Sequence, residues 1–439
     1  MPIQDTAADR AHFVRKQMPQ TGLFAGHEWR VSPTPFHLGA EMAKDLEGLG
    51  RVLLQFNKAV NRLYRLSIEG KQPAWVAEWL EQGKPADLIA LQRSPAMKNE
   101  MPRVIRPDLL ITDGGLSITE LDSVPGGIGL TAWLNQTYAR MGFSVTGGGD
   151  GMLRGFASIF GDAPNVDIIV SEESATYRPE MAWVADKLGE ARFKIRDANF
   201  TQFQDGGAAY RFFELFDTPN VPNAPQLFER AREKQTRLTP PPKTIFEEKM
   251  LFALLWNRNL REFWRQELGE GFFNRLLRLV PYSWMVDPTP LPPQGAIPEL
   301  SLTDWNQLKT LSQKERELIL KVSGFSPKAW GARGVYLGND LSHAEWSAAV
   351  ESALASFGTS PHILQRYRKP SLVEFQWFDF QKEQLIPMPG RVRLCPYYFV
   401  SGDGDAARAN LGGILATVCP ADKKIIHGMT EAVFAPGAE

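Results

Sequence analysis

One short stretch constrains this chain more than any other: residues 106–122 read as a strand, a tight turn and a returning strand. The Asp-Gly-Gly at 113–115 supplies residues that tolerate the positive φ of a hairpin turn. Side chains two apart on a strand share a face, so Glu120 and Asp122 project together, and the hairpin brings Asp108 beside them. Three converging carboxylates need a cation, and oxygen-only ligation suits Mg²⁺ carried with nucleotide phosphates.

The composition excludes several classes of protein. The chain has 439 residues, enough for about two to four domains. The formal net charge of −1 gives no general attraction to nucleic acid or to an anionic membrane. No stretch approaches the roughly 20 apolar residues of a membrane helix, and residues 1–13 lack an apolar signal core. Two cysteines, Cys395 and Cys419, make no disulfide framework, so we expect a cytoplasmic protein that binds neither nucleic acid nor membrane.

The pattern of apolar residues divides the chain into four regions. Residues 1–35 look irregular, and apolar residues then recur at helical spacing from about 38 to 68. We therefore predict a largely helical N-terminal region over 1–100. The acidic hairpin follows within 101–144, then a small α/β unit over 145–238 and a strand-rich region over 239–439, which begins after a proline-rich boundary.

The α/β unit is predicted from a strand–helix–strand pattern. Val166–Val170 is a short apolar run, Pro179–Leu188 has helical spacing, and the next apolar run begins at Phe193. This order favours a small parallel layer. We interpret the polar run 171–180 as a cap for the helix and the glycine run 147–151 as a turn, with ligand contacts the lesser alternative for both.

A second chemical signal lies further along. A buried strand ends at Lys321 and opens into a loop, Ser323–Gly334, with three glycines and Lys328, before another strand begins at Val335. Glycines let backbone N–H groups approach phosphate oxygens, and a lysine supplies the matching charge. The spacing is not that of a Walker A motif, and a loop of this kind standing alone is more often only a loop.

Two further segments give that loop a context. Lys249 stands at the head of an apolar segment predicted to be helical over Ile245–Leu255. A lysine there usually only extends its charge to solvent along an apolar surface. The strand Leu364–Tyr367 could present backbone donors and acceptors to an adenine edge.

The order of these motifs resembles the circularly permuted ATP-grasp enzymes, of which the C-terminal synthetase part of glutathionylspermidine synthase is the best-known type. In that family an Arg-x-Asp begins a strand and a Glu-x-Asn follows on the returning strand, ahead of a proline. Arg106, Asp108, Glu120 and Pro125 fit, whereas Asp122 replaces the asparagine. A lysine heading an apolar helix, a lysine before a phosphate-covering loop and a hinge strand then follow in the family's order, over roughly residues 100–435.

The resemblance implies a mixed α+β and α/β fold, a circularly permuted ATP-grasp core with a small parallel subdomain. It implies that ATP and Mg²⁺, or Mn²⁺, are used together. The metal ligands would be Asp108, Glu120 and Asp122, and the residues facing the transferred phosphoryl group Arg106 and Arg393. The nucleotide-binding residues would be Lys249, Lys321, Ser323, Gly324, Lys328, Gly331, Gly334, Gln365, Arg366 and Tyr367.

The same resemblance implies an ATP-dependent carboxylate–amine ligase that forms ADP through an acyl phosphate. Its partners would be small-molecule or peptide carboxylates and amines. Two alternatives remain open at this point: an ATP-grasp phosphotransferase, and a nonenzymatic nucleotide-binding or scaffold protein. The sequence identifies neither the substrates nor the oligomeric state.

Overall fold

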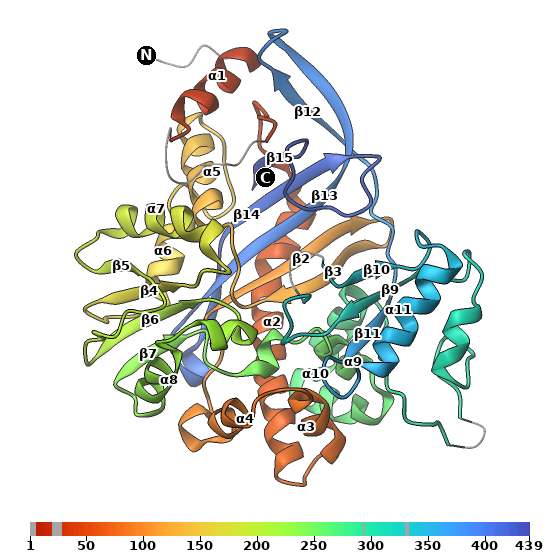
Figure 1. Cartoon of the computed structure of the whole chain (residues 1–439). Coiled ribbons are helices and arrows are strands. Elements are labelled where there is room, and N and C mark those ends of the chain that lie inside the picture. The colour runs from red at the N-terminus through yellow and green to blue at the C-terminus, as the bar shows by residue number, and fades with distance from the viewer. Residues whose placement is uncertain (1–5, 20–28, 293–294, 330–332) are drawn as a thin grey trace.

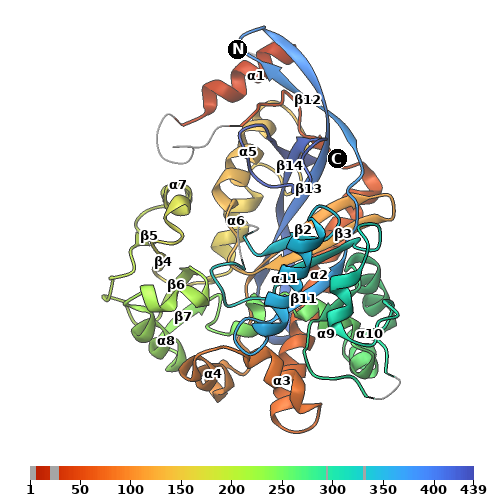
Figure 2. The same ribbon diagram turned by 45° about the vertical axis from the view of Figure 1, so that its right-hand side comes forward.

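The computed structural model describes residues 6–19, 29–292, 295–329 and 333–439. Three sheets organise the described part of the chain (Figures 1 and 2). The largest has the strand order β1-β15-β14-β13-β2-β3, with β12 paired to β13 at the side. Its strands are β1 Phe36–His37, β2 Val104–Thr112, β3 Gly115–Asp122, β12 Val373–Asp379, β13 Gln384–Ser401, β14 Arg408–Pro420 and β15 Val433–Ala438.

The predicted acidic hairpin is confirmed as β2 and β3, at one edge of this large sheet. Its neighbour β13 comes from almost 300 residues later in the chain. The core between the sheet and the long helix α2, Ala40–Ile68, holds the apolar stripe that predicted this helix, with Leu46, Leu53 and Phe56 fully buried. Three more helices lie in the lower part of the molecule in Figure 1: α3 Ala74–Glu81, α4 Ala86–Arg93 and α10 Arg261–Leu279.

The N-terminal region departs from the sequence prediction. Residues 1–35 were expected to be irregular, but Ala7–Gln17 forms the helix α1. Thr6 caps it by accepting a hydrogen bond from the backbone N–H of Asp9. Its buried residues Ala11 and Val14 belong to the core that also holds β13 residues, so distant contacts stabilise a helix whose apolar pattern is weak.

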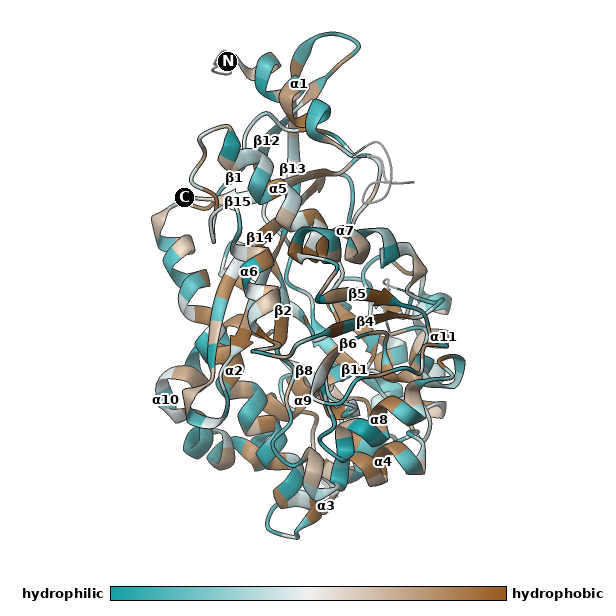
Figure 3. Ribbon diagram, turned by 90° about the vertical axis from the view of Figure 1, so that its left-hand side faces the viewer, coloured by the Kyte–Doolittle hydropathy of each residue, from teal (hydrophilic) through white to brown (hydrophobic). Residues whose placement is uncertain are grey.

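A parallel sheet of four strands forms the second unit, as predicted. The strand order is β5-β4-β6-β7, and every pair is parallel. Ile168 of β4 belongs to the core that also holds residues of α5, α6 and α7, whereas its neighbour Ile169 belongs to the core that holds residues of α8. Helices α7 and α8 therefore lie on opposite sides of this sheet (Figure 3). The elements are β4 Val166–Val170, β5 Phe193–Arg196, β6 Gly207–Phe212, β7 Thr236–Thr239, α5 Ile128–Arg140, α6 Gly151–Ser158, α7 Arg178–Leu188 and α8 Ala224–Arg232.

The third sheet is antiparallel, with the order β10-β9-β11-β8 and the helix α11, His343–Ala355, packed on it. The strands are β8 Ser283–Met285, β9 Leu318–Val322, β10 Val335–Leu337 and β11 His362–Arg366. The strand that ends near Lys321 and the strand that starts at Val335 are both confirmed. They pair with each other, so the intervening loop leaves and returns at one edge of this sheet.

The single helix predicted over Ile245–Leu255 is wrong. The chain forms a 3-10 turn over Thr244–Glu247, then the short helix α9, Leu251–Trp256. Between them Glu248 is extended, with φ −113° and ψ 124°, because its buried carboxylate is held by the ammonium of Lys84, 2.6 Å away. No helix in the described part of the chain is long and apolar enough to cross a membrane.

Candidate active site

The hairpin register places the predicted metal ligands on one face of β2 and β3. Asp108 pairs with Glu120 across the hairpin, and Arg106 pairs with Asp122. Directly opposed residues of an antiparallel pair project to the same face, as do residues two apart. The four charged side chains therefore gather at one place, as the sequence predicted.

Arginine side chains occupy the space between the two aspartates. Arg106 Nε lies 3.0 Å from Asp108 Oδ1, and Arg106 Nη2 lies 3.0 Å from Asp122 Oδ2. Arg393 reaches the same aspartate from β13, with Nη1 3.1 Å from Asp108 Oδ2. Arg393 pairs in register with Leu110, which shares the face of Asp108, so the sheet directs this arginine into the site.

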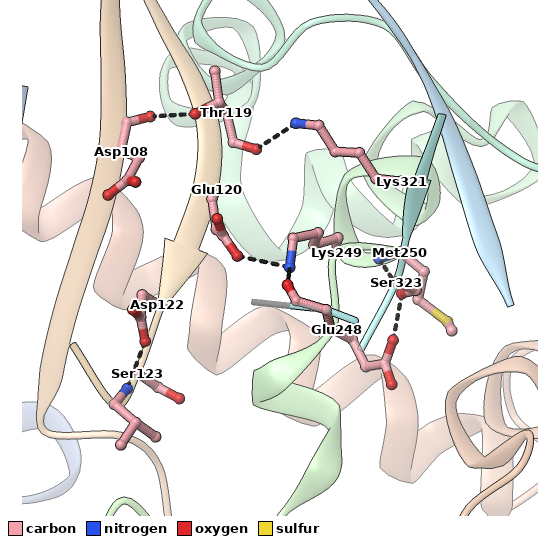
Figure 4. A network of polar contacts seen from close by, with 12 residues as sticks. Asp108, Thr119, Glu120, Asp122, Ser123, Glu248, Lys249, Met250, Lys321 and Ser323 are labelled. Atoms are coloured by element: carbon pink, nitrogen blue, oxygen red, sulfur yellow. Dashed lines mark hydrogen bonds and ion pairs between the residues drawn. The ribbon is translucent and has the colours of Figure 1, made fainter. Parts of the chain in front are cut away.

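Two lysines reach β3 from different segments of the chain. Lys249 Nζ lies 2.7 Å from Glu120 Oε1 and 2.6 Å from the carbonyl oxygen of Ala329 (Figure 4). Lys321 Nζ donates to the carbonyl oxygen of Thr119 at 3.0 Å and to Gln365 Oε1 at 2.9 Å. The two ammonium groups thus contact adjacent residues of β3, although 72 positions separate the lysines in the sequence.

These charged groups line one cavity of about 650 Å³. Its volume lies in the usual range for small-molecule sites. Its walls come from all three sheets. Among its described lining residues are Arg106, Asp108, Glu120, Asp122, Lys249, Lys321, Tyr367 and Arg393.

The acidic groups differ in their ionisation. Burial disfavours the charged form of Asp108, but the charges of Arg106 and Arg393 outweigh it and hold the pKa of Asp108 below its ordinary value. For Asp122 burial prevails, and the neighbouring Glu120 adds repulsion, so its pKa is raised. The site therefore holds one firmly ionised carboxylate beside one that gains a proton more easily.

The two lysines also differ. Burial lowers the pKa of Lys321 to about 8, and the nearby charge of Lys249 acts in the same direction. Burial opposes the charge of Lys249 too, but its contact with Glu120 raises the pKa above the ordinary value. Lys249 is thus a permanent cation, whereas the charge of Lys321 depends on pH near neutrality.

The three carboxylates fit Mg²⁺ in type, since all are oxygen donors on one face. Among the residues that the structure describes, no group of three acidic, histidine or cysteine side chains is close enough to hold a metal ion. Each of the three carboxylates is instead paired with an arginine or a lysine. A cation would have to replace at least the ammonium of Lys249 at Glu120.

Several of the predicted nucleotide-binding residues lie outside the lining of this cavity. They are Ser323, Gly324, Lys328, Gly334, Gln365 and Arg366. Ser323 instead donates through Oγ to Glu248 and accepts from the backbone N–H of Met250 at 2.8 Å. A side chain at Gly324 would come within 2.2 Å of the Glu247 carbonyl oxygen, so close packing accounts for this glycine. Gly331 falls outside the described residues.

The expected adenine strand is β11, at the interior of its sheet. Its residue Gln365 pairs with Ile319 on one side and Ser283 on the other. The backbone N–H groups of Arg366 and Tyr367 already donate to the carbonyl oxygens of Tyr282 and Glu317, at 2.9 and 3.0 Å. The Gln365 side chain holds Lys321 rather than facing the cavity.

Sequence reasoning missed a carboxyl group on the opposite wall. Glu180 of α7 accepts a hydrogen bond from the backbone N–H of Gly129 at 3.0 Å, and burial raises its pKa to about 7. The run 171–180 was interpreted as a helix cap, but the N-cap residue of α7 is Tyr177, which makes no such side-chain bond. A glutamate in the first turn of a predicted helix, on its apolar side, was the available signal.

Two other motifs keep structural roles. Side chains at Gly147 or Gly151 would collide with the carbonyl oxygen of Gly412, at 2.1 and 2.5 Å, which supports the turn interpretation of this glycine run. Cys395 Sγ lies 3.4 Å from Asp108 Oδ1, and burial raises the pKa of its thiol to about 12. A thiol with that pKa is a poor nucleophile.

Comparison with known proteins bears on the fold. No protein-family model matches the sequence, and no curated protein is similar to it. A solved structure described as a glutathione synthetase-like effector from Globodera pallida, in apo form, superposes with a TM-score of 0.54 at 11% identity, over 99% of this chain and 98% of that one. A putative gamma-glutamylcysteine synthetase from Methylobacillus flagellatus has a TM-score of 0.41 at 13% identity, over 92% and 89%. The first of these shows that this mixed α+β chain shares its fold with a glutathione synthetase-like protein along nearly its whole length.

Proposed function

We propose that this chain is an ATP-dependent carboxylate–amine ligase with a circularly permuted ATP-grasp core. The observation that carries the proposal is the convergence of two arginines, two lysines and three carboxylates, from four distant segments, on one cavity. A shared fold alone would not specify chemistry. The charge pattern supports the proposed chemistry, because alternating cations and carboxylates suit a metal-bound polyphosphate.

The residues have distinct proposed roles. Lys249 and Lys321 would neutralise phosphate oxygens, and their neighbouring contacts on β3 support a shared target. Arg106 and Arg393 would face the transferred phosphoryl group. Asp108, Glu120 and Asp122 would hold Mg²⁺, which neutralises phosphate charge when it is bound.

The reaction we propose has two steps. A substrate carboxylate oxygen attacks the γ-phosphorus of ATP, the bond to the bridging oxygen breaks, and ADP leaves with that oxygen. The amine then attacks the acyl carbon, the acyl–oxygen bond breaks, inorganic phosphate leaves, and the amine gives up a proton. The chain's contribution is to position the reactants and stabilise charge.

Isotope transfer would test the proposal. In a screen of carboxylates and amines for ADP release, a carboxylate labelled with ¹⁸O should pass one label to the phosphate released. ADP release without an amine, with stable phosphorylation of an acceptor hydroxyl, would favour a phosphotransferase. ATP binding without turnover across the panel would favour a nonenzymatic nucleotide-binding protein.

We expect Lys321→Ala to weaken ATP binding about tenfold to a hundredfold, because a charge-assisted contact contributes about 1.5–3 kcal/mol. Isothermal calorimetry would measure the affinity. Lys382→Ala is a matched control, since this lysine is exposed and its amine pairs with Asp379, 3.6 Å away. Equal affinities for the wild type and Lys321→Ala would contradict the assigned role.

The affinity for ATP should also fall as pH rises. Lys321, with a pKa of about 8, is charged below that pH and neutral above it, so the attraction to phosphate weakens between pH 8 and 9.5. The decrease should approach about tenfold per pH unit, until the pKa of the bound state is reached. Lys321→Arg keeps its charge throughout and should remove the dependence. A wild-type affinity that stays constant over this range would oppose the assignment.

A further inference from the structure

A second large cavity, of about 780 Å³, lies away from the candidate active site. The described residues that line it include none of those lining the first cavity. It is bounded by α2, the segment 97–103, the strand β7 with the turn before it, and the turn between β13 and β14. The N-terminal helices, the parallel sheet and the large sheet therefore meet at this cavity.

Basic side chains dominate its lining. Lys58, Arg62 and Arg65 occur at positions i, i+4 and i+7 of α2, so they share one face of the helix. The other three cationic residues are Arg103, Lys234 and Arg237, against the acidic residues Glu100, Asp403 and Asp405. Six cations thus face three carboxylates, in a chain whose formal net charge is only −1.

Among the described residues, half of these cations have no carboxylate within ion-pair distance. The Arg65 side chain makes no hydrogen bond or ion pair with any described residue, Lys58 Nζ donates to the carbonyl oxygen of Gly404 at 2.9 Å, and Arg237 Nη1 donates to that of Phe160 at 3.1 Å. The remaining cations do have carboxylate partners. A positive excess therefore remains in a concave space.

A buried lysine lies beneath the floor of the cavity. The buried amine of Lys243 donates to Asn61 and to the carbonyl oxygens of Met97 and Glu100, and all three of these residues line the cavity. Burial lowers the pKa of Lys243 to about 7, and the charge of Arg65 acts in the same direction. A lysine with this pKa is only partly protonated near pH 7, and a bound anion would favour its charged form.

We propose that this cavity binds a small multivalent anion, a phosphorylated or polycarboxylate metabolite. Its volume lies within the range of about 300–1,000 Å³ typical of small-molecule sites. A nucleic acid would need a basic groove that tracks its backbone, whereas these charges converge on one concavity. The site does not depend on the ATP-ligase activity proposed above.

The two cavities lie along the same two strands of the large sheet, β2 and β13. Arg103 lines this cavity, and Arg106, three residues further along β2, lines the candidate active site. On β13, Val400 lines this cavity and Arg393 lines the candidate active site. An anion bound here would lie at the beginning of β2 and the end of β13, the two strands that carry the arginines proposed to face the phosphoryl group.

The test is calorimetric titration of the full chain with inorganic pyrophosphate and, separately, with citrate. We expect Lys58→Gln/Arg65→Gln to weaken binding of the accepted anion at least about tenfold, since each charge-assisted contact contributes more than a neutral one. Lys44→Gln is the matched control, because Lys44 is an exposed residue of the same helix outside the cavity. Lys321→Ala should leave this binding event unchanged. Tighter binding of pyrophosphate would indicate a phosphorylated ligand, and tighter binding of citrate would indicate a polycarboxylate.

Three outcomes would overturn the proposal. The first is that neither pyrophosphate nor citrate binds the wild-type protein. The second is binding that Lys321→Ala removes while the double variant retains it, which would place the anion in the candidate active site. The third is displacement of pyrophosphate by a short single-stranded oligonucleotide with higher affinity, which would identify a nucleic-acid surface. None of these depends on turnover of ATP, so failure of the proposed ligase activity would be a separate result.

Discussion

Glu120→Gln should abolish ATP turnover and leave the fold intact. Glutamine keeps the size of the side chain but replaces an anionic oxygen by an amide, so it no longer offers a charged ligand to Mg²⁺. Metal stabilisation of transferring phosphate contributes several kcal/mol, so we expect a loss of at least about a hundredfold in ADP formation. The measurement is ADP release at saturating Mg²⁺ and ATP, alongside the urea unfolding curve.

A second effect of this substitution must be separated from the first. The change also removes the charge partner of Lys249, which lies 2.7 Å away. Magnesium-dependent ATP affinity should therefore be measured too, because loss of the metal ligand predicts that added Mg²⁺ no longer strengthens ATP binding. Glu374→Gln, an exposed residue of β12, is the matched control. Turnover by Glu120→Gln equal to that of this control would refute the metal assignment.

Lys84→Met should destabilise the protein by about 3–5 kcal/mol, the cost of leaving a buried charge without its partner. The side chains of Lys84 and Glu248 are 1% and 0% exposed, and their charged atoms are 2.6 Å apart. Glu248 in turn accepts from Ser323 and precedes Lys249, so this pair also positions part of the candidate active site. Urea unfolding would measure the change in the free energy of unfolding.

The chain supplies a control for this prediction. Lys71 pairs with Glu69 at 2.7 Å, with side chains 67% and 43% exposed. Exposed pairs contribute about 0–1 kcal/mol, so Lys71→Met should have little effect. The double variant Lys84→Met/Glu248→Leu should regain much of the lost stability, because no unpaired buried charge remains. Equal stabilities of Lys84→Met and Lys71→Met would contradict the burial argument.

Local patterns in the sequence were sufficient for several elements. Alternation around an Asp-Gly-Gly turn predicted β2 and β3, and the apolar stripe over about 38–68 predicted a long helix or a helical pair, of which the structure has the single helix α2. The run Val166–Val170 predicted a buried strand of the parallel sheet. In each case the side-chain period and the turn chemistry are properties of neighbouring residues, which the sequence shows directly.

Other elements depended on contacts that no local pattern contains. Residues 7–17 form a helix that packs against distant strands, and the extended Glu248 interrupts a segment with strong helical periodicity. The reason in the second case is a lysine 164 positions earlier, since pairing a buried carboxylate outweighs helix propensity. Propensity is therefore a weak guide where a buried charge must find its partner.

The candidate site divides in the same way. The sequence by itself determined which charged residues share the face of the hairpin, because strand periodicity places Arg106, Asp108, Glu120 and Asp122 together. Only the tertiary structure decided that Lys249 pairs with Glu120, that Arg393 reaches Asp108, and that Glu180 closes the opposite wall. Those contacts join segments separated by more than 50 residues, and their distances follow from how three sheets and their helices pack. Sequence spacing does not encode that packing.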